Sequence, residues 1–218
     1  MTERTQSETD VPTTPSFPTP PGYPADLERD ATTMLGTRVH VRPIRPDDAP
    51  RLVVFHSTLT PRSVYRRFFS AHPKLSAKEV ERFTCVDYVD RLALIAEIGD
   101  RMVAVARYDR TPDTSEAEVA FVVADDCQHH GIASLLLELL ADAAWRVGIT
   151  TFVASTLMEN REMLNVFASS KFDTSTSVDC GVIEIRFMID PKLCHEADST
   201  GHQRAADRAH DHQGPPAC

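Results

Sequence analysis

The stretch Ala117–Leu140, AEVAFVVADDCQHHGIASLLLELL, contains the pattern that decides the fold. Its apolar segment, residues 118–123, predicts a buried strand, and the polar residues 124–130 predict a short turn. From Gly131 onward, apolar residues repeat at helical spacing: Ile132, Leu136, Leu139, Leu140 and Ala143. A strand is therefore expected to lead directly into the N-terminus of a helix.

The turn has the composition of an anion-binding loop. Helix N-termini leave backbone N–H groups unpaired and carry partial positive charge, so phosphate oxygens bind there readily. The turn reads Gln128-x-x-Gly131-x-Ala133, in which Gly131 permits a close approach of backbone to ligand and Ala133 keeps the first helical turn slim. Taken alone, this spacing is equally typical of an ordinary strand-to-helix corner closed by a glycine.

Composition limits the classes of protein that fit. The chain has 218 residues, a formal net charge of −9, no apolar run of about 20 residues and no basic-then-apolar leader. These features favour a cytoplasmic protein without a membrane segment and disfavour nucleic acid as a partner. The five cysteines form no C-x-x-C pair, which disfavours a disulfide framework or a structural zinc site.

Both ends of the chain are expected to be disordered around one folded domain. Residues 1–36 contain six of the 15 prolines and no periodic apolar pattern, and residues 192–218 contain four histidines and little to bury. The tail histidines lack a ligand-like spacing, so no metal is expected. We therefore predict a disordered Pro-rich arm (1–36), one domain (37–191) and a disordered tail (192–218).

The predicted domain alternates strands and helices. Alternation and turn signals predict strands at 37–44, 91–98, 102–107, 118–123, 150–157, 173–178 and 182–189. Helices are predicted at 50–57, 61–69, 76–84, from 131 to Gly148, and from Asn160 to about 171. Gly99-Asp100 joins two strands as an antiparallel hairpin. The order predicts an α/β fold, a mixed sheet with helices on both faces.

These residues resemble a known family. The Gln128–Ala133 turn resembles the acetyl-CoA pyrophosphate loop of the GNAT N-acetyltransferases, and the element order from 37 to 190 matches theirs. Four segments are most similar to bacterial Pat-type protein-lysine acetyltransferases: VYRRFF (64–69), VAVARY (103–108), AEVAFVV (117–123) and ENREML (159–164). The resemblance implies a central, mostly antiparallel mixed sheet flanked by helices. It also implies an enzyme that transfers acetyl from acetyl-CoA to lysine side chains of proteins.

The resemblance also implies where the cosubstrate binds. Backbone groups of the strand would pair with the pantetheine arm, amides of the loop would hold the pyrophosphate, and a later helix start would reach the CoA arm. The matching residues are Phe121 and Val123 in the strand, Gln128, His129, Gly131, Ile132 and Ala133 in the loop, and Asn160 and Met163 in the helix. Asn160 is in addition a typical helix N-cap.

Glu118 is the candidate general base. A lysine amine has a pKa of about 10.4, so near neutral pH it must lose a proton before it attacks a thioester. Glu118 begins an apolar strand, where a carboxylate is costly to bury unless it faces a cleft or has partners. Pat-type enzymes have their base at the matching position. The alternatives are that Glu118 lies on a solvated face beside Glu116, or that Glu97 is the base.

Several residues depart from the family pattern or leave its function open. His129-His130 replaces the usual Gly-Arg or Gly-Lys, Lys171 replaces a glycine, and Phe167 replaces a tyrosine that many members use as a proton donor. The three arginines of the 61–69 helix are expected to lie on a solvated helix face, which is favoured over contact with a phosphate or a partner: Arg62, Arg66 and Arg67. The acceptor could also be a small amine or a protein N-terminus, or the chain could be a catalytically silent acyl-CoA-binding module. The oligomeric state is left open.

Overall fold

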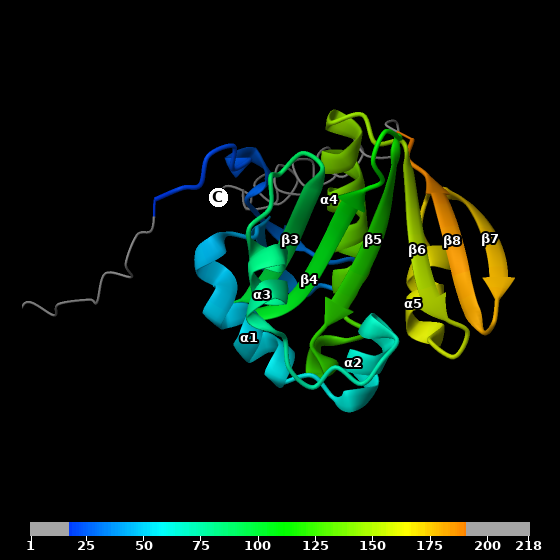
Figure 1. The fold of residues 1–218 in the computed structure, drawn as a ribbon, viewed down its shortest axis with the longest axis horizontal. Helices are drawn as coiled ribbons and strands as arrows, with labels where there is room; N and C mark the ends of the chain where they lie inside the picture. The colour runs from blue at the N-terminus through cyan, green and yellow to red at the C-terminus, as the bar shows by residue number, and fades with distance from the viewer. Residues whose placement is uncertain (1–17, 191–218) are drawn as a thin grey trace, which may run out of the picture.

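The computed structural model describes residues 18–190 and contains one eight-stranded sheet (Figure 1). The strands are β1 (Arg29–Thr32), β2 (Arg38–Pro43), β3 (Arg91–Ile98), β4 (Arg101–Arg110), β5 (Glu116–Val123), β6 (Thr151–Leu157), β7 (Asp173–Asp179) and β8 (Val182–Met188). Their spatial order is β1-β2-β3-β4-β5-β6-β8-β7, and every neighbouring pair is antiparallel except β5 and β6. The predicted mixed, mostly antiparallel sheet is confirmed.

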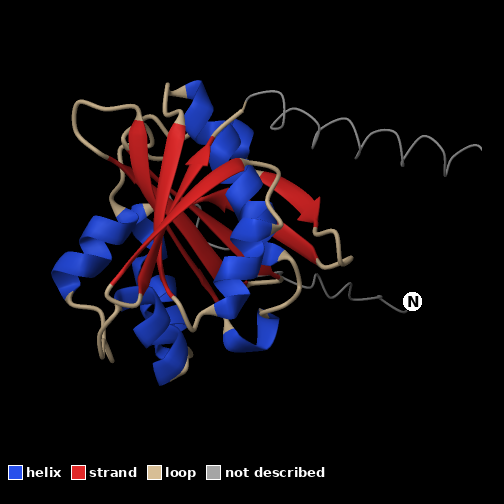
Figure 2. Cartoon of the chain, turned by 90° about the vertical axis from the view of Figure 1, so that its right-hand side faces the viewer, coloured by secondary structure: helices blue, strands red, loops and turns tan. Residues whose placement is uncertain are grey.

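Helices cover both faces of this sheet (Figure 2). They are α1 (Ala49–Ser57), α2 (Pro61–Phe68), α3 (Ala77–Thr84), α4 (Ile132–Arg146) and α5 (Arg161–Ala168), with short 3-10 turns at Ala25–Leu27, Pro46–Asp48 and Asp125–Cys127. Helices α1 to α3 lie on one face, and α4 and α5 on the other (Figure 1). The predicted helices are all present, with ends within two or three residues of those expected.

The longest helix, α4, anchors the core. Its buried side chains include Ile132, Leu136 and Leu140, and they pack against β3, β4 and β5. Each such side chain contributes about 1.5–3 kcal/mol when removed from water. The helix ends where Gly148, with φ of +80°, takes the left-handed conformation expected after a helix C-terminus. The strand-to-helix unit predicted from the opening stretch is therefore the centre of the fold.

The folded part begins earlier than residue 37, so the expected boundary is wrong. Strand β1 pairs with β2 from Arg29 opposite Val41 to Thr32 opposite Arg38, and Leu27 and Thr33 are buried. Tyr23 makes an edge-to-face contact with Tyr88. Proline-rich, polar composition suggested disorder, but the exposed edge of β2 supplies the backbone partners that β1 needs, which local composition does not reveal. Residues 1–17 and the tail from 191 lie outside the described residues.

Candidate active site

Strands β5 and β6 separate part-way along their length (Figure 1), and a cleft lined by residues of β5 lies where they part. They pair from Glu116 opposite Thr151 only as far as Val119 opposite Ala154, whereas β5 stays paired with β4 up to Val123. The edge of β5 from Ala120 to Val123 therefore has no strand partner on the β6 side. Backbone amides and carbonyls on that edge are available to a ligand.

Strand geometry identifies which groups face this opening. The N–H of Ala124 donates to the carbonyl of Val103, at the end of the β4–β5 ladder. Because residues of an antiparallel ladder alternate between facing their partner strand and facing away, Phe121 and Val123 direct their N–H and C=O groups into the cleft. The Val123 carbonyl accepts a hydrogen bond from Gln128 Nε2 at 3.3 Å. Phe121 and Val123 are the two strand positions proposed from sequence for the pantetheine arm.

The loop between β5 and α4 presents a bare helix N-terminus to the same cleft. Gly131 has φ of +76° and His129 has φ of +63°, both left-handed. No side chain caps α4, and the first intrahelical donor beyond the loop is the N–H of Leu135, which donates to Gly131. The amides of Ile132, Ala133 and Ser134 precede that donor, so they remain available to an anion.

The loop is fixed to α2 by polar contacts. Asp125 accepts hydrogen bonds from the backbone N–H of Thr60 and from the hydroxyls of Thr60 and Ser63, at 2.7–2.9 Å. These bonds lower the pKa of Asp125 even though its partial burial acts to raise it. The ionised carboxylate therefore holds the loop and helix α2 together beside the cleft.

These features enclose one cavity of about 280 Å³. Its lining includes all nine residues proposed from sequence to bind the cosubstrate: Phe121, Val123, Gln128, His129, Gly131, Ile132, Ala133, Asn160 and Met163. The predicted cap at α5 is confirmed, since Asn160 Oδ1 accepts a hydrogen bond from the Met163 N–H at 3.4 Å. Residues that are far apart in sequence thus meet around one elongated space.

Glu118 lies beside this cavity, at a smaller one of about 40 Å³. The two cavities share wall residues from β5, α2 and α5, among them Phe121, Arg67 and Asn160. Glu118 is exposed, and the β4–β5 register places it directly opposite Asp109. Side chains in that relation lie on one face of the sheet, about 4.5–5.5 Å apart at Cβ. Glu118 is therefore the carboxylate beside the large cavity, whereas Asp109 lines neither cavity and pairs with Arg107.

Two arginines of α2 belong to the site, and the expectation of a solvated face is wrong for them. Arg66 lines both cavities and pairs with Glu162 of α5 at 2.9 Å, across the cleft. Arg67 lines both as well, and burial, followed by the charge of Arg107, lowers its pKa to about 10. Arg62 is exposed, as expected. Consecutive residues on a helix point about 100° apart, so two adjacent arginines followed by two phenylalanines cannot all lie on the solvent face. This pattern could have indicated from sequence that one of the arginines faces the protein.

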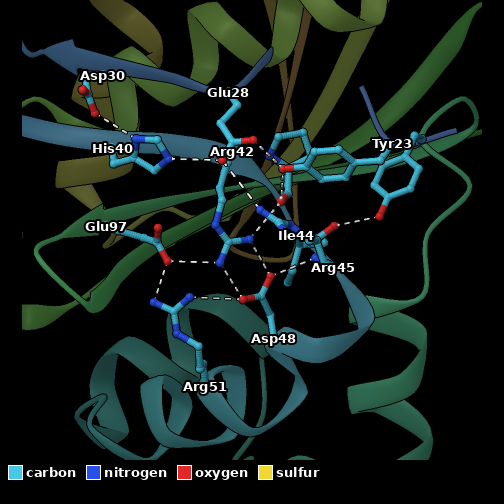
Figure 3. Close-up of polar contacts among 12 residues, drawn as sticks. Tyr23, Glu28, Asp30, His40, Arg42, Ile44, Arg45, Asp48, Arg51 and Glu97 are labelled. Atoms are coloured by element: carbon cyan, nitrogen blue, oxygen red, sulfur yellow. Dashed lines mark hydrogen bonds and ion pairs between the residues drawn. The ribbon is translucent and has the colours of Figure 1, made fainter. Parts of the chain in front are cut away.

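Glu97, the reserve base, belongs to a different cluster (Figure 3). It is 7% exposed and pairs with Arg42 at 3.2 Å and with Arg51 at 2.5 Å. Asp48 binds the same Arg42 through two hydrogen bonds of 2.7 and 2.8 Å. Burial acts to lower the pKa of Arg42, but the bonds to Asp48 and the charges of both carboxylates raise it. Glu97 lines none of the cavities described above, so its position favours Glu118 over Glu97 as the candidate base.

The departures from the family pattern have simple structural consequences. His129 lines the large cavity, whereas His130 is exposed and does not. Lys171 has no positive φ, so the backbone there does not need glycine. Phe167 is buried, in edge-to-face contact with Phe121 and Phe187. Among the described residues, no tyrosine lines either cavity.

Residues 18–190 contain neither a metal-ligand cluster nor a membrane-spanning helix. No group of three or more His, Cys, Asp or Glu side chains in that range is arranged to hold a metal ion. None of the helices there is long and apolar enough to cross a membrane. The tail histidines lie outside the described residues.

Comparison with known proteins identifies the family. The model of the acetyltransferase (GNAT) family matches residues 61–172. The chain belongs to the GNAT acetyltransferase family. The solved GNAT domain of S. lividans PAT is 43% identical, with a TM-score of 0.72, over 76% of this chain and 99% of that one. GNAT acetyltransferases use acetyl-CoA, so this chain is an acetyl-CoA-dependent acetyltransferase.

Two curated relatives extend this GNAT assignment. Acetyltransferase Pat of Mycolicibacterium smegmatis is 33% identical over 134 residues, which are 60% of this chain and 40% of the relative. Acetyltransferase PA5475 of Pseudomonas aeruginosa is 28% identical over 153 residues, which are 66% of this chain and 82% of the relative. This GNAT chain therefore spans less than half of the Pat relative.

The geometry fits acetyl-CoA on grounds of its own. A free strand edge offers alternating donors and acceptors for an amide-bearing arm, and the bare N-terminus of α4 offers donors for phosphate. A Cβ atom at Gly131 would lie 3.3 Å from Thr33 Cβ, so a side chain there would require Thr33 or the loop to shift by a few tenths of an ångström. The residues present can thus hold both the arm and the pyrophosphate.

Proposed function

We propose that this acetyltransferase acetylates lysine side chains of proteins, with Glu118 as the general base. The observation that carries the proposal is the position of Glu118, at the small cavity that shares walls with the 280 Å³ cavity. A lysine ammonium approaching there meets Glu118, whose charge attracts it. Glu118 then takes a proton from the ammonium, and the neutral amine can attack the thioester carbonyl.

The shape of the site supports a side-chain amine as the acceptor. The cavity at Glu118 is only about 40 Å³, yet Glu118 itself is exposed. A narrow opening at the surface suits one extended side chain carried on a larger molecule. The likeness to two Pat acetyltransferases agrees with this interpretation.

The remaining residues of the site would bind and orient the cosubstrate. We propose that Phe121 and Val123 pair with the pantetheine arm through backbone groups, and that the amides from Gln128 to Ala133 bind the pyrophosphate. Asn160 and Met163 would contact the arm from the α5 side. No tyrosine lines the cavities among the described residues, so the proposal includes no general acid, and a thiol pKa near 8.5 lets CoA leave as thiolate.

Incubation of host lysate with the enzyme and labelled acetyl-CoA, followed by mass spectrometry, tests the acceptor. Label on lysine side chains supports the proposal, whereas label only on protein N-termini or only on small amines contradicts it. Glu118→Gln tests the base, and it should lower kcat about 10²- to 10⁴-fold while acetyl-CoA affinity is kept.

The matched control for this substitution is Glu116→Gln. Glu116 lies on the same strand, pairs with Arg186 and lines neither of the two site cavities. Its loss should leave kcat within a few fold of wild type. Equal losses in the two variants would remove Glu118 from the role of base.

A further inference from the structure

Arg67 occupies the junction of the cavities. It lines the 280 Å³ cavity with Phe121 to Val123, and it lines the small cavity with Glu118. It also lines a third, mostly apolar cavity under α1 and α3. Of the described residues, only Arg67 lines all three. Its guanidinium is therefore next to the place where cosubstrate and acceptor meet.

The Arg67 guanidinium has no ion-pair partner among the described residues, whereas Arg66 and Arg107 each have one. Arg66 pairs with Glu162, and Arg107 binds Asp109 through two hydrogen bonds of 3.0 and 3.2 Å. No hydrogen bond or ion pair joins the Arg67 guanidinium to another residue between 18 and 190. Its one close contact is with the ring of Phe68, at 5.1 Å from the centroid.

The side chain of Arg67 is half-buried, and burial is the main cause that lowers its pKa. Its guanidinium is therefore less well hydrated than one on the open surface, and no carboxylate pairs with it directly. The nearest charges are Arg107, which repels it, and Glu118 and Asp109, which attract it. Donors held unpaired in a poorly solvated site are suited to an oxygen that becomes negative only during the reaction.

We propose that Arg67 is a catalytic residue that stabilises the negative oxygen formed when the amine attacks the thioester. The amine nitrogen bonds to the carbonyl carbon, and the C=O π electrons move to the oxygen. The C=O bond then re-forms, the C–S bond breaks, and CoA leaves as thiolate. Glu118 holds the first proton lost by the ammonium, and the second, lost from the nitrogen as the amide forms, passes to water.

The charges of the site favour this role. Before attack, the anion nearest to Arg67 is Glu118, and the acceptor is a cation. After the proton transfer Glu118 and the amine are both neutral. After attack the substrate oxygen is the new anion, and the nitrogen is cationic until it loses its second proton. Arg67 thus exchanges one anionic neighbour for another without moving, so little reorganisation is needed.

The kinetic test compares Arg67→Met with Arg62→Met, both in the full chain. Arg62 is the matched control because it is an exposed arginine of the same helix and lines none of the three cavities. Arg67→Met should lower kcat about 10²- to 10³-fold with KM for acetyl-CoA changed less than about threefold. Arg67→Lys should recover part of kcat. A rise in KM at unchanged kcat would overturn the proposal.

A binding test needs neither turnover nor a known acceptor. S-carboxymethyl-CoA carries a carboxylate beside the sulfur, and S-acetonyl-CoA carries a neutral ketone in its place. By calorimetry, Arg67→Met should weaken binding of the carboxylate about 10- to 100-fold, the range of a charge-assisted hydrogen bond, and leave the ketone nearly unchanged. Arg62→Met should change neither.

Three outcomes would overturn the inference. If Arg67→Met weakened the binding of both analogues equally, Arg67 would be a structural residue, and Arg67→Met would then also lower Tm in the absence of ligand. Unchanged binding of both would remove it from the site. Preference of the wild type for succinyl-CoA over acetyl-CoA, lost in Arg67→Met, would make it an acyl-selectivity residue instead. The inference rests on the proposed acetyl transfer at this junction, whatever the acceptor is. The calorimetry uses no acceptor, so its result remains valid even if lysine is not acetylated.

Discussion

Replacing Gly131 by alanine tests the link between loop geometry and cosubstrate binding. Gly131 has φ of +76°, and an alanine held there costs about 1–2 kcal/mol. The new Cβ would also lie 3.3 Å from Thr33 Cβ, which is closer than ordinary van der Waals contact. Gly148 is the control, because its φ is +80° and a Cβ there meets nothing within 4 Å. Gly148→Ala therefore measures backbone strain alone.

The two substitutions should separate in magnitude. Both should lose about 1–2 kcal/mol of stability from strain. For a domain of this size, that lowers Tm by about 2–8 °C. Gly131→Ala should lose about 1 kcal/mol more, the lower range for overpacking. Because relief of the contact must displace the loop amides, acetyl-CoA affinity should also fall about tenfold, or 1.4 kcal/mol.

Melting curves with and without acetyl-CoA measure both effects. At 100 times the Kd, a ligand stabilises the folded state by about 2.7 kcal/mol, which raises Tm by about 5–11 °C in wild type and Gly148→Ala. A tenfold weaker site at the same concentration yields about 1.4 kcal/mol, or about half that shift. Equal ligand-induced shifts in Gly131→Ala and Gly148→Ala would refute the role of the loop.

Four other predictions follow from the same contacts. Glu97→Gln removes one of the two negative charges that balance the buried Arg42, so the free energy of unfolding measured in urea should fall by about 3 kcal/mol while kcat stays unchanged. A 100-fold fall in kcat would instead support Glu97 as the base. Removing residues 1–36 deletes β1 and Leu27, and calorimetry should record a lower Tm; an unchanged Tm would mean that β1 contributes nothing. Burial, then His72, lowers the pKa of His56, while the charge of Glu79 opposes this. Because His56 binds a proton more readily in the unfolded chain, neutral His56 contributes fully to stability above about pH 6.5, and that contribution is lost as the pH falls toward the pKa of the folded state. His56→Gln should therefore flatten the plot of unfolding free energy against pH below about pH 6.5. An unaltered plot would contradict the lowered pKa of His56. With acetyl-CoA saturating, kcat/KM should rise with pH to a plateau, because no tyrosine among the described residues is placed to act as a general acid. Burial raises the pKa of Tyr108, whose hydroxyl donates to the carbonyl of Val89, and Tyr65 lines neither site cavity. A fall in kcat/KM at alkaline pH that Tyr65→Phe abolishes would contradict this.

Local signals in the sequence predicted the helices and strands from residue 37 to 190, and the resemblance to the GNAT family supplied the residues of the large cavity's wall. Apolar periodicity, the Ser76–Glu79 capping box and the glycines at 131 and 148 predicted helix ends because caps and turns are made within a few residues. The loop residues and the strand before it are adjacent in sequence, so their meeting at one cavity needed only the correct strand-to-helix order.

Contacts between distant segments were decided by tertiary structure alone. Strand β1 is stable because the edge of β2 pairs with it, and Glu97 is structural because Arg42 and Arg51 reach it from other elements. Arg67 faces the cavities, and not solvent, because α2 lies over the point where β5 and β6 separate. A residue's own neighbours in sequence do not carry that information, since burial and charge compensation depend on what the rest of the chain brings to it.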